Sequence, residues 1–141
     1  AGHEVVQLGS YAPGTDASKG YFMLPHLVLN PPDSASIVAC EQMGPILPVM
    51  KFRTDEEAVR RANDSIYGLA SSVWSADFDK AFALGARLEA GTTFVNGHSL
   101  YTIEPDAPFG GFKESGIGYE LGGTVGLGQY VQLKSVTDNH M

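Results

Sequence analysis

Residues 46–97 read ILPVMKFRTDEEAVRRANDSIYGLASSVWSADFDKAFALGARLEAGTTFVNG, and this stretch decides the fold. It begins with a nearly continuous apolar run, which is typical of a strand covered on both faces. Two helical patterns follow, and each leads into another short strand, first LASSVWS and then TTFVNG. This alternation between Ile46 and Val95 predicts an α/β fold with a parallel sheet and right-handed crossovers.

Both helices have recognisable starts. In the first, Thr54 and Glu57 form a capping box, in which the threonine hydroxyl accepts from the Glu57 amide and the glutamate reaches back. In the second, Asp77 is placed to cap the helix, and Gly91 is expected just past its end. The apolar stripe of the second helix is predicted to contain Phe78, Ala81, Phe82 and Leu88.

The segments on either side of this stretch are less regular. EVVQLG, residues 4–9, predicts a first strand, and YFMLPHLVLN, residues 21–30, predicts extended chain interrupted at Pro25. One helical turn is expected near Ser34–Val38. YVQLKSV, residues 130–136, predicts a strand close to the C-terminal end.

The overall composition excludes several classes of function. Lys and Arg total 9 against 16 Asp and Glu, which gives a net charge of −7 and leaves no basic surface for nucleic acid. No apolar run approaches membrane-spanning length, and no leader pattern is visible. One cysteine cannot form an internal disulfide, so we expect a reducing, cytoplasmic setting.

Cys40 is the first candidate for catalysis, because it directly precedes an acid, Glu41. A reactive thiol needs a lowered pKa, and a neighbouring carboxylate acts in the opposite direction. The sequence therefore favours a small, semi-buried side chain over a redox or thioester thiol. The four histidines are scattered without the spacing of metal ligands, so no metal site is expected.

Two later segments raise the question of ligand binding. GIGYELG, residues 116–122, has the wrong glycine spacing for a dinucleotide fingerprint, so its glycines indicate turns or close backbone approach. The connection from Gly97 to Pro108 follows the last strand of the alternation, where α/β folds build ligand sites. It is long for a structureless loop, which favours a ligand loop. A mobile surface loop remains the alternative.

Taken together, five segments resemble the aldehyde dehydrogenase superfamily, in the family's order from about residue 20 onward. They are GYFMLP (20–25), EQMGPILPV (41–49), AVRRANDSIYGLASSVWSAD (58–77), RLEAGTTFVN (87–96) and PFGGFKESGIGYELG (108–122). The resemblance implies a partial aldehyde-dehydrogenase-like catalytic domain, with a mostly parallel sheet and flanking helices. Residues 1–128 match the C-terminal portion of that domain, and residues 129–141 match its oligomerisation strand and tail.

The resemblance implies NAD(P)-dependent oxidation of an aldehyde to a carboxylic acid in the complete enzyme. In the family, a cysteine attacks the aldehyde, hydride passes to NAD or NADP, and a glutamate activates water. The cysteine and this glutamate precede the matched region, so no catalytic residue is expected in this chain and the isolated chain is expected to be inactive. Cys40 does not match the family nucleophile.

For the cofactor, the resemblance implicates two residues. Glu41 matches a glutamate that accepts hydrogen bonds from the hydroxyls of the nicotinamide ribose, and Gly44 and Pro45 shape the turn that presents it. Met43 stands where the family has a phenylalanine near the nicotinamide, so it fills the space without stacking.

For the substrate, residues 97–107 resemble the loop that lines the aldehyde tunnel. The candidate tunnel residues are Leu100, Tyr101, Ile103 and Phe109, which suit an apolar or aromatic aldehyde. Glu104 and Asp106 are solvated rim charges or, alternatively, favour a cationic substrate. Asn96 matches an asparagine with a structural backbone contact, and Tyr119 replaces the usual arginine, so any family salt bridge there is lost.

The oligomeric state also follows from the resemblance. Residues 130–136 match the strand that joins a neighbouring subunit in family dimers and tetramers, which implies a homo-oligomer. A non-enzymatic alternative stays open: a truncated relative that keeps the fold and acts as a self-associating structural module.

Overall fold

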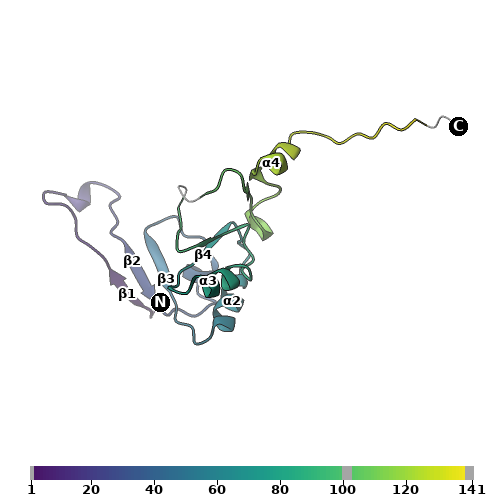
Figure 1. Cartoon of the computed structure of the whole chain (residues 1–141). Helices are drawn as coiled ribbons and strands as arrows, with labels where there is room; N and C mark the ends of the chain where they lie inside the picture. Colours follow the sequence, from purple (N-terminus) through teal and green to yellow (C-terminus); the bar gives the residue numbers. More distant parts are fainter. Residues whose placement is uncertain (1, 100–102, 139–141) are drawn as a thin grey trace. The chain divides into compact units, whose positions relative to one another are not determined.

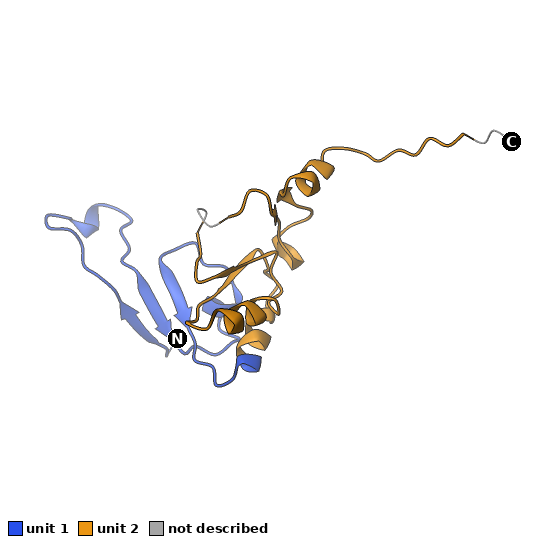
Figure 2. Cartoon of the chain, in the orientation of Figure 1, with its two compact units in different colours: residues 1–57 blue, residues 58–141 orange. Residues whose placement is uncertain are grey.

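The computed structural model of the chain describes residues 2–99 and 103–138. The chain divides into two compact units, Ala1–Glu57 and Ala58–Met141, shown in blue and orange in Figure 2. Strands and helices occur in both units (Figure 1), which confirms the predicted α/β class. Within the described residues, no helix has both the length and the apolar character needed to cross a membrane.

In unit 1, the described strands form one sheet in the order β1–β2–β3. They are β1 (Glu4–Gln7), β2 (His26–Leu29) and β3 (Ile46–Val49). β1 runs antiparallel to β2, whereas β3 runs parallel to it and is reached through α1 (Ser36–Ala39). The central position of β2 explains the burial of Val28, which is 4 % exposed. The predicted helical turn and the break at Pro25 are confirmed.

The long connection between β1 and β2 contains the short helix η1 (Ala17–Lys19). Asp16 caps it by accepting from the Ser18 amide at 3.1 Å and the Ser18 hydroxyl at 2.6 Å. The Ser18 hydroxyl, then Lys19 and the Ser18 amide, hold the pKa of the Asp16 carboxyl below its ordinary value. This cap stabilises the turn of an otherwise exposed loop.

Unit 2 is built around a strand–helix–strand unit: β4 (Ala70–Val73), α3 (Phe78–Gly85) and β5 (Thr92–Val95). The two strands are parallel, and α3 packs on both. Ala81 is fully buried, and an added methyl group at Gly85 would lie 3.1 Å from the Thr93 side chain, so small residues let the helix approach the sheet. Further along lie the antiparallel pair β6 (Pro108–Phe109) and β7 (Glu120–Leu121), with η3 (Lys113–Ser115) between them, and then α4 (Thr124–Gly128).

Both predicted helix starts are confirmed. α2 (Asp55–Asn63) follows Thr54, whose hydroxyl accepts from the Glu57 amide at 3.1 Å. The Glu57 carboxylate accepts from the Arg53 amide at 2.9 Å, one residue before the position expected for a capping box. Asp77 caps α3 by accepting from the Lys80 amide at 2.9 Å.

The predicted end of α3 is wrong. The helix ends at Gly85, well before Gly91. The amides of Arg87 and Leu88 donate to carbonyls only three residues back, so the last turn tightens and the chain leaves the helical path. Leu88 therefore lies beyond the helix rather than in its stripe.

Two strand predictions are also corrected. The alternation between Ile46 and Val95 suggested one parallel sheet, but β3 pairs with β2 while β4 pairs with β5. Alternation fixes the order of elements along the chain, not which strands are neighbours. Residues 131–138 form no strand in the described part of the chain (yellow in Figure 1), because a strand requires a hydrogen-bonded neighbour.

The α3 cap generates a stability prediction. Asp77→Ala removes the acceptor of the Lys80 amide and is expected to lower the free energy of unfolding by about 1 kcal/mol. Urea unfolding followed by circular dichroism measures this change. Asp79→Ala removes a first-turn carboxylate but leaves the cap, so it is the control and should cost less. Equal losses in the two variants would contradict the assignment of Asp77 as the cap.

Candidate functional site

Glu41 lies on a short ledge, residues 40–45, between α1 and β3. The Cys40 amide donates to the Ser36 carbonyl at 2.9 Å and closes α1. The Gln42 side-chain amide donates to the carbonyls of Cys40 at 2.9 Å and Ser36 at 3.3 Å, which folds the chain back against the helix. These contacts hold the backbone on both sides of Glu41, whose side chain is exposed.

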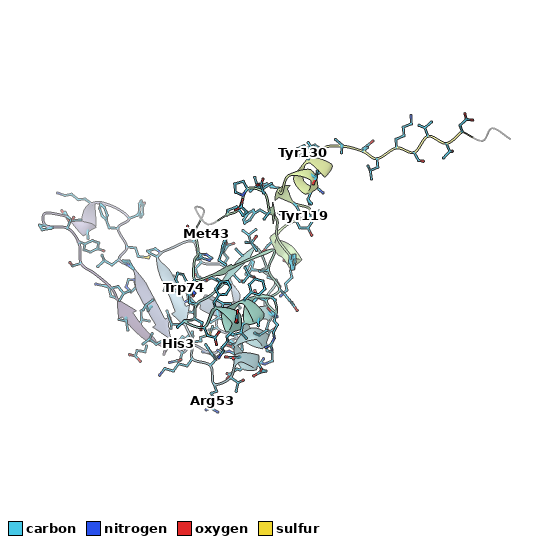
Figure 3. The ribbon with its side chains drawn as sticks, in the orientation of Figure 1. His3, Met43, Arg53, Trp74, Tyr119 and Tyr130 are labelled. Carbon is cyan, nitrogen blue, oxygen red and sulfur yellow. The ribbon has the colours of Figure 1, made fainter. Side chains whose placement is uncertain are left out.

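The second half of the ledge is tied to the sheet. The Ile46 amide donates to the Gly44 carbonyl at 2.8 Å, and the His26 amide donates to the Pro45 carbonyl at 2.8 Å. Gly44 and Pro45 therefore make the turn into β3 that the resemblance implied. Met43, labelled in Figure 3, is 88 % exposed on this turn. Glu41 and Met43 thus lie two residues apart on an exposed segment just before β3.

The semi-buried position predicted for Cys40 is wrong, because its thiol is free and exposed. The helix before it has a single turn and ends at Ala39, so Cys40 does not reach a packed face. In the part of the chain that the structure describes, no cluster of three or more His, Cys, Asp or Glu side chains is arranged to hold a metal ion.

Asn96 has the structural backbone contact expected of it. Its φ is 53°, and its amide donates to the Val73 carbonyl at 2.9 Å, which extends the parallel β4–β5 ladder. Its side chain accepts from the Ser75 amide at 2.8 Å and donates to the Ser75 carbonyl at 2.9 Å. Asn96 therefore fixes the point where the candidate substrate loop leaves the sheet.

Asn30 has the same arrangement in unit 1, and sequence reasoning missed it. Its φ is 46°, its amide donates to the Val49 carbonyl at 2.8 Å, and its side chain accepts from the Lys51 amide at 3.0 Å. Both asparagines directly follow an apolar strand, in VLN and FVN, and asparagine tolerates positive φ better than most residues. That shared pattern is the signal that could have revealed Asn30.

The candidate substrate loop is described at both of its ends. At the first, the His98 ring contacts the Phe94 ring edge-on, with 5.7 Å between centroids. At the second, the Ala107 amide donates to the Glu104 carbonyl at 3.0 Å, and the Gly122 amide donates to the Pro105 carbonyl at 3.1 Å. The second end is therefore tied to the chain just after β7.

The predicted tunnel residues are only partly described. Leu100 and Tyr101 lie outside the described residues. Ile103 is half-buried near the second end of the loop, and Phe109 is half-buried on β6. Glu104 and Asp106 are exposed, as rim charges would be.

Each unit also has a hollow. One in unit 1 has a volume of about 450 Å³ and is lined mainly by β1, β2 and α1. One in unit 2 has a volume of about 350 Å³ and is lined by α3, β5 and Phe112. The residues that line these two hollows do not include Glu41, Met43, Ile103 or Phe109.

The segments around Glu41, Asn96 and the glycine-rich turns fit one family. The family model described as "Aldehyde dehydrogenase family" matches residues 1–136. The chain belongs to the aldehyde dehydrogenase family. The match begins at residue 1, earlier than the motif resemblance, which begins near residue 20.

Aldehyde dehydrogenase 1A1 of Gallus gallus is 44 % identical over 124 residues, covering 88 % of this chain and 24 % of the relative. Aldehyde dehydrogenase, cytosolic 2, of Macroscelides proboscideus is 43 % identical, covering 88 % of this chain and 50 % of the relative. The chain therefore spans half or less of the length of these curated relatives.

Solved structures agree with this membership. HpcC from Thermus thermophilus has a TM-score of 0.85 at 33 % identity and covers 99 % of this chain and 28 % of its own. Mycobacterium tuberculosis aldehyde dehydrogenase complexed with NAD⁺ has a TM-score of 0.80 at 34 % identity, covering 93 % and 26 %. The α/β arrangement is therefore that of part of an aldehyde dehydrogenase.

Asn96 generates the second prediction. Asn96→Ala loses the side-chain bonds to Ser75 and places a Cβ residue without local hydrogen bonding at positive φ, so it should cost roughly 2–4 kcal/mol of stability. Asn96→Gly accepts the backbone conformation and loses only the side-chain bonds, so it should cost less. Chemical unfolding of the two variants measures the loss of stability in each. A glycine variant as stable as the parent would show that the Ser75 contacts contribute nothing.

Proposed function

We propose that this chain supplies one wall of the active site of an NAD(P)-dependent aldehyde dehydrogenase, which oxidises an aldehyde to a carboxylic acid. The observation that carries the proposal is the ledge at residues 40–45. There, hydrogen bonds to α1 and β2 hold the backbone around an exposed Glu41. Membership of the aldehyde dehydrogenase family supports this reading.

Glu41 is suited to a ribose. A carboxylate has two oxygens and accepts hydrogen bonds only, so it matches a pair of neighbouring hydroxyl donors. Binding both hydroxyls of the nicotinamide ribose limits rotation of the ring and orients it for hydride transfer. Met43, two residues on, offers a flexible apolar surface on the same turn. We propose these two residues as the cofactor contacts of this chain.

The substrate contacts are proposed on the loop after Asn96. Leu100, Tyr101, Ile103 and Phe109 would line an apolar or aromatic aldehyde site. Support comes from the loop's position at the carboxyl end of β5, a parallel strand, since α/β folds build ligand sites there. Phe109 is additionally held on a paired strand, β6.

The chain carries no proposed nucleophile or base. Cys40 lies beside the cofactor-binding glutamate and does not match the family cysteine. Other parts of a complete enzyme would supply the thiol, the glutamate base and most of the NAD(P) site. We therefore propose that the isolated chain does not turn over aldehydes.

Assembly and location complete the proposal. We propose that residues 1–128 supply the domain portion and that residues 129–141 supply the oligomerisation strand and tail, the strand being formed only when a neighbouring subunit pairs with it. Leu133 and Val136 are 101 % and 83 % exposed, and pairing with a neighbouring subunit would cover them. A cytoplasmic location is supported by the single cysteine and by a relative named as cytosolic.

A second function rests on the same exposed segment. A self-associating structural module without enzymatic activity would use residues 130–136 as its pairing edge. Analytical ultracentrifugation distinguishes it: the module requires a stable oligomer of the isolated chain, and a strict monomer at all concentrations excludes it.

The proposed function is tested in two steps. The purified 141-residue chain with NAD⁺ or NADP⁺ and several aldehydes should form no NAD(P)H, because its one cysteine, Cys40, does not match the family nucleophile. A chimera in which this chain replaces the matching segment of Gallus gallus aldehyde dehydrogenase 1A1 should be active. In it, Glu41→Gln should reduce kcat about 100-fold through misplacement of the ring.

Glu4→Gln is the matched control, since Glu4 is also an exposed acid of unit 1. It should leave kcat unchanged. Aldehyde turnover by the isolated chain would contradict the proposed inactivity. If the Glu41→Gln chimera has an unaltered kcat and an unaltered KM for NAD⁺, the proposal that Glu41 binds the ribose is wrong.

A further inference from the structure

Lys113 lies where three distant segments of unit 2 meet. Its ammonium donates to the Asn63 carbonyl, at the end of α2, at 2.6 Å. It also pairs with the Glu89 carboxylate, after α3, at 2.9 Å. The lysine side chain is 24 % exposed and that of Glu89 is 58 % exposed, so the lysine is the more enclosed partner.

Asn63 completes this arrangement. Its side-chain amide donates to the Arg87 carbonyl at 2.9 Å, and its side-chain oxygen accepts from the Glu89 amide at 2.9 Å. Asn63 therefore bonds directly to the 87–89 segment. Lys113 contacts both partners, through the Asn63 carbonyl and the Glu89 carboxylate. We refer to Lys113, Asn63 and Glu89 as the Lys113 clasp.

The backbone of Lys113 is also unusual. Its φ is 54°, in the left-handed region that residues other than glycine rarely adopt. Such a conformation persists where the surroundings determine it, and it often marks a functional constraint. Here the bonds of the Lys113 side chain to Asn63 and Glu89 hold this backbone conformation. The Glu114 amide, which donates to the Ile66 carbonyl at 3.0 Å, holds the backbone of the next residue.

From the clasp, a short connection leads back to β6 and the candidate substrate loop. Only Gly110, Gly111 and Phe112 separate β6 from Lys113. An added methyl group at Gly91 would collide with the Gly110 carbonyl oxygen, so these two backbones are in close contact. The short connection therefore couples the position of η3 to that of β6, which carries Phe109, and the contact with Gly91 holds the start of this connection.

We propose that Lys113 is a positioning residue for the aldehyde site. Through Asn63 and Glu89 its ammonium holds η3, and η3 holds β6 and the second end of the loop, residues 103–107. Lys113 does not touch the substrate. Its effect on the aldehyde rests on the proposed function of Phe109, whereas its effect on loop order does not.

Hydrogen exchange of the full chain tests the clasp. Lys113→Met keeps most of the length of the side chain and removes its ammonium group. It should raise the exchange rates of the Ala107, Phe112 and Gly122 amides about tenfold, because these amides depend on the position of η3 and the β6–β7 pair. The Asn96 amide, bonded in the β4–β5 ladder, should keep its rate.

Two further variants sharpen the result. Lys134→Met, at an exposed lysine after α4, is the matched control and should change none of these rates. Lys113→Arg keeps the charge and should restore most of the protection that Lys113→Met loses. Unchanged Ala107 and Gly122 rates in Lys113→Met would overturn the proposal. So would an equal rise at Asn96, which would indicate general destabilisation.

The chimera tests the consequence for the aldehyde. With Lys113→Met, KM for the aldehyde should rise about tenfold while KM for NAD⁺ stays constant, because the loop and not the Glu41 ledge is released. The positioning role would be overturned if the KM values for the aldehyde and for NAD⁺ rose together, or if neither of them changed. If the chimera with Lys113 intact is inactive, the proposed function fails, and the exchange rates still decide whether the clasp orders the loop.

Discussion

The buried backbone of Gly68 is the constraint on which unit 2 depends. Its carbonyl accepts from the Gly91 and Phe112 amides, each at 2.9 Å, and its amide donates to the Ser115 hydroxyl at 2.8 Å. A side chain there would meet the Glu89 carbonyl oxygen at 2.7 Å, so glycine is required. The segment after α2, the start of β5 and the turn η3 are joined at this one residue. The Lys113 clasp links the end of α2, the segment before β5 and η3 a second time.

Much of the fold could be predicted because its signals are local. Thr54 and Asp77 are recognisable as caps from the next three residues alone, and strand periodicity is visible within four to six residues. The end of α3 could not be located from the sequence because Leu88 continues the apolar spacing and Gly91 is a plausible residue after a helix end, although the helix ends at Gly85. β7 and α4 lie in a glycine-rich segment whose composition favours turns, so tertiary contacts rather than propensity determine them.

The candidate site could be predicted less completely. Glu41 and Met43 could be proposed as cofactor contacts from the sequence because they belong to a contiguous motif, and the structure shows the hydrogen bonds that hold the backbone around them. Lys113 and Asn63 were missed because no local sequence pattern shows their contacts. Lys113 is 50 residues from Asn63 in the chain, and Asn63 is 24 residues from Arg87. The exposure of Cys40 was missed because its apolar neighbours suggested a packed face that a one-turn helix does not provide.

The double hydrogen bond of Asn96 also bears on chemical ageing. Asn96 is followed by Gly97, a pair in which the next amide nitrogen can readily attack the asparagine side chain and release ammonia. That reaction needs a free, rotating side chain. In the folded unit both polar atoms of the side chain are bonded to Ser75, so we expect deamidation to be slower while β4 and β5 stay paired. The contact at the start of the candidate substrate loop thus makes the lifetime of the asparagine depend on folding.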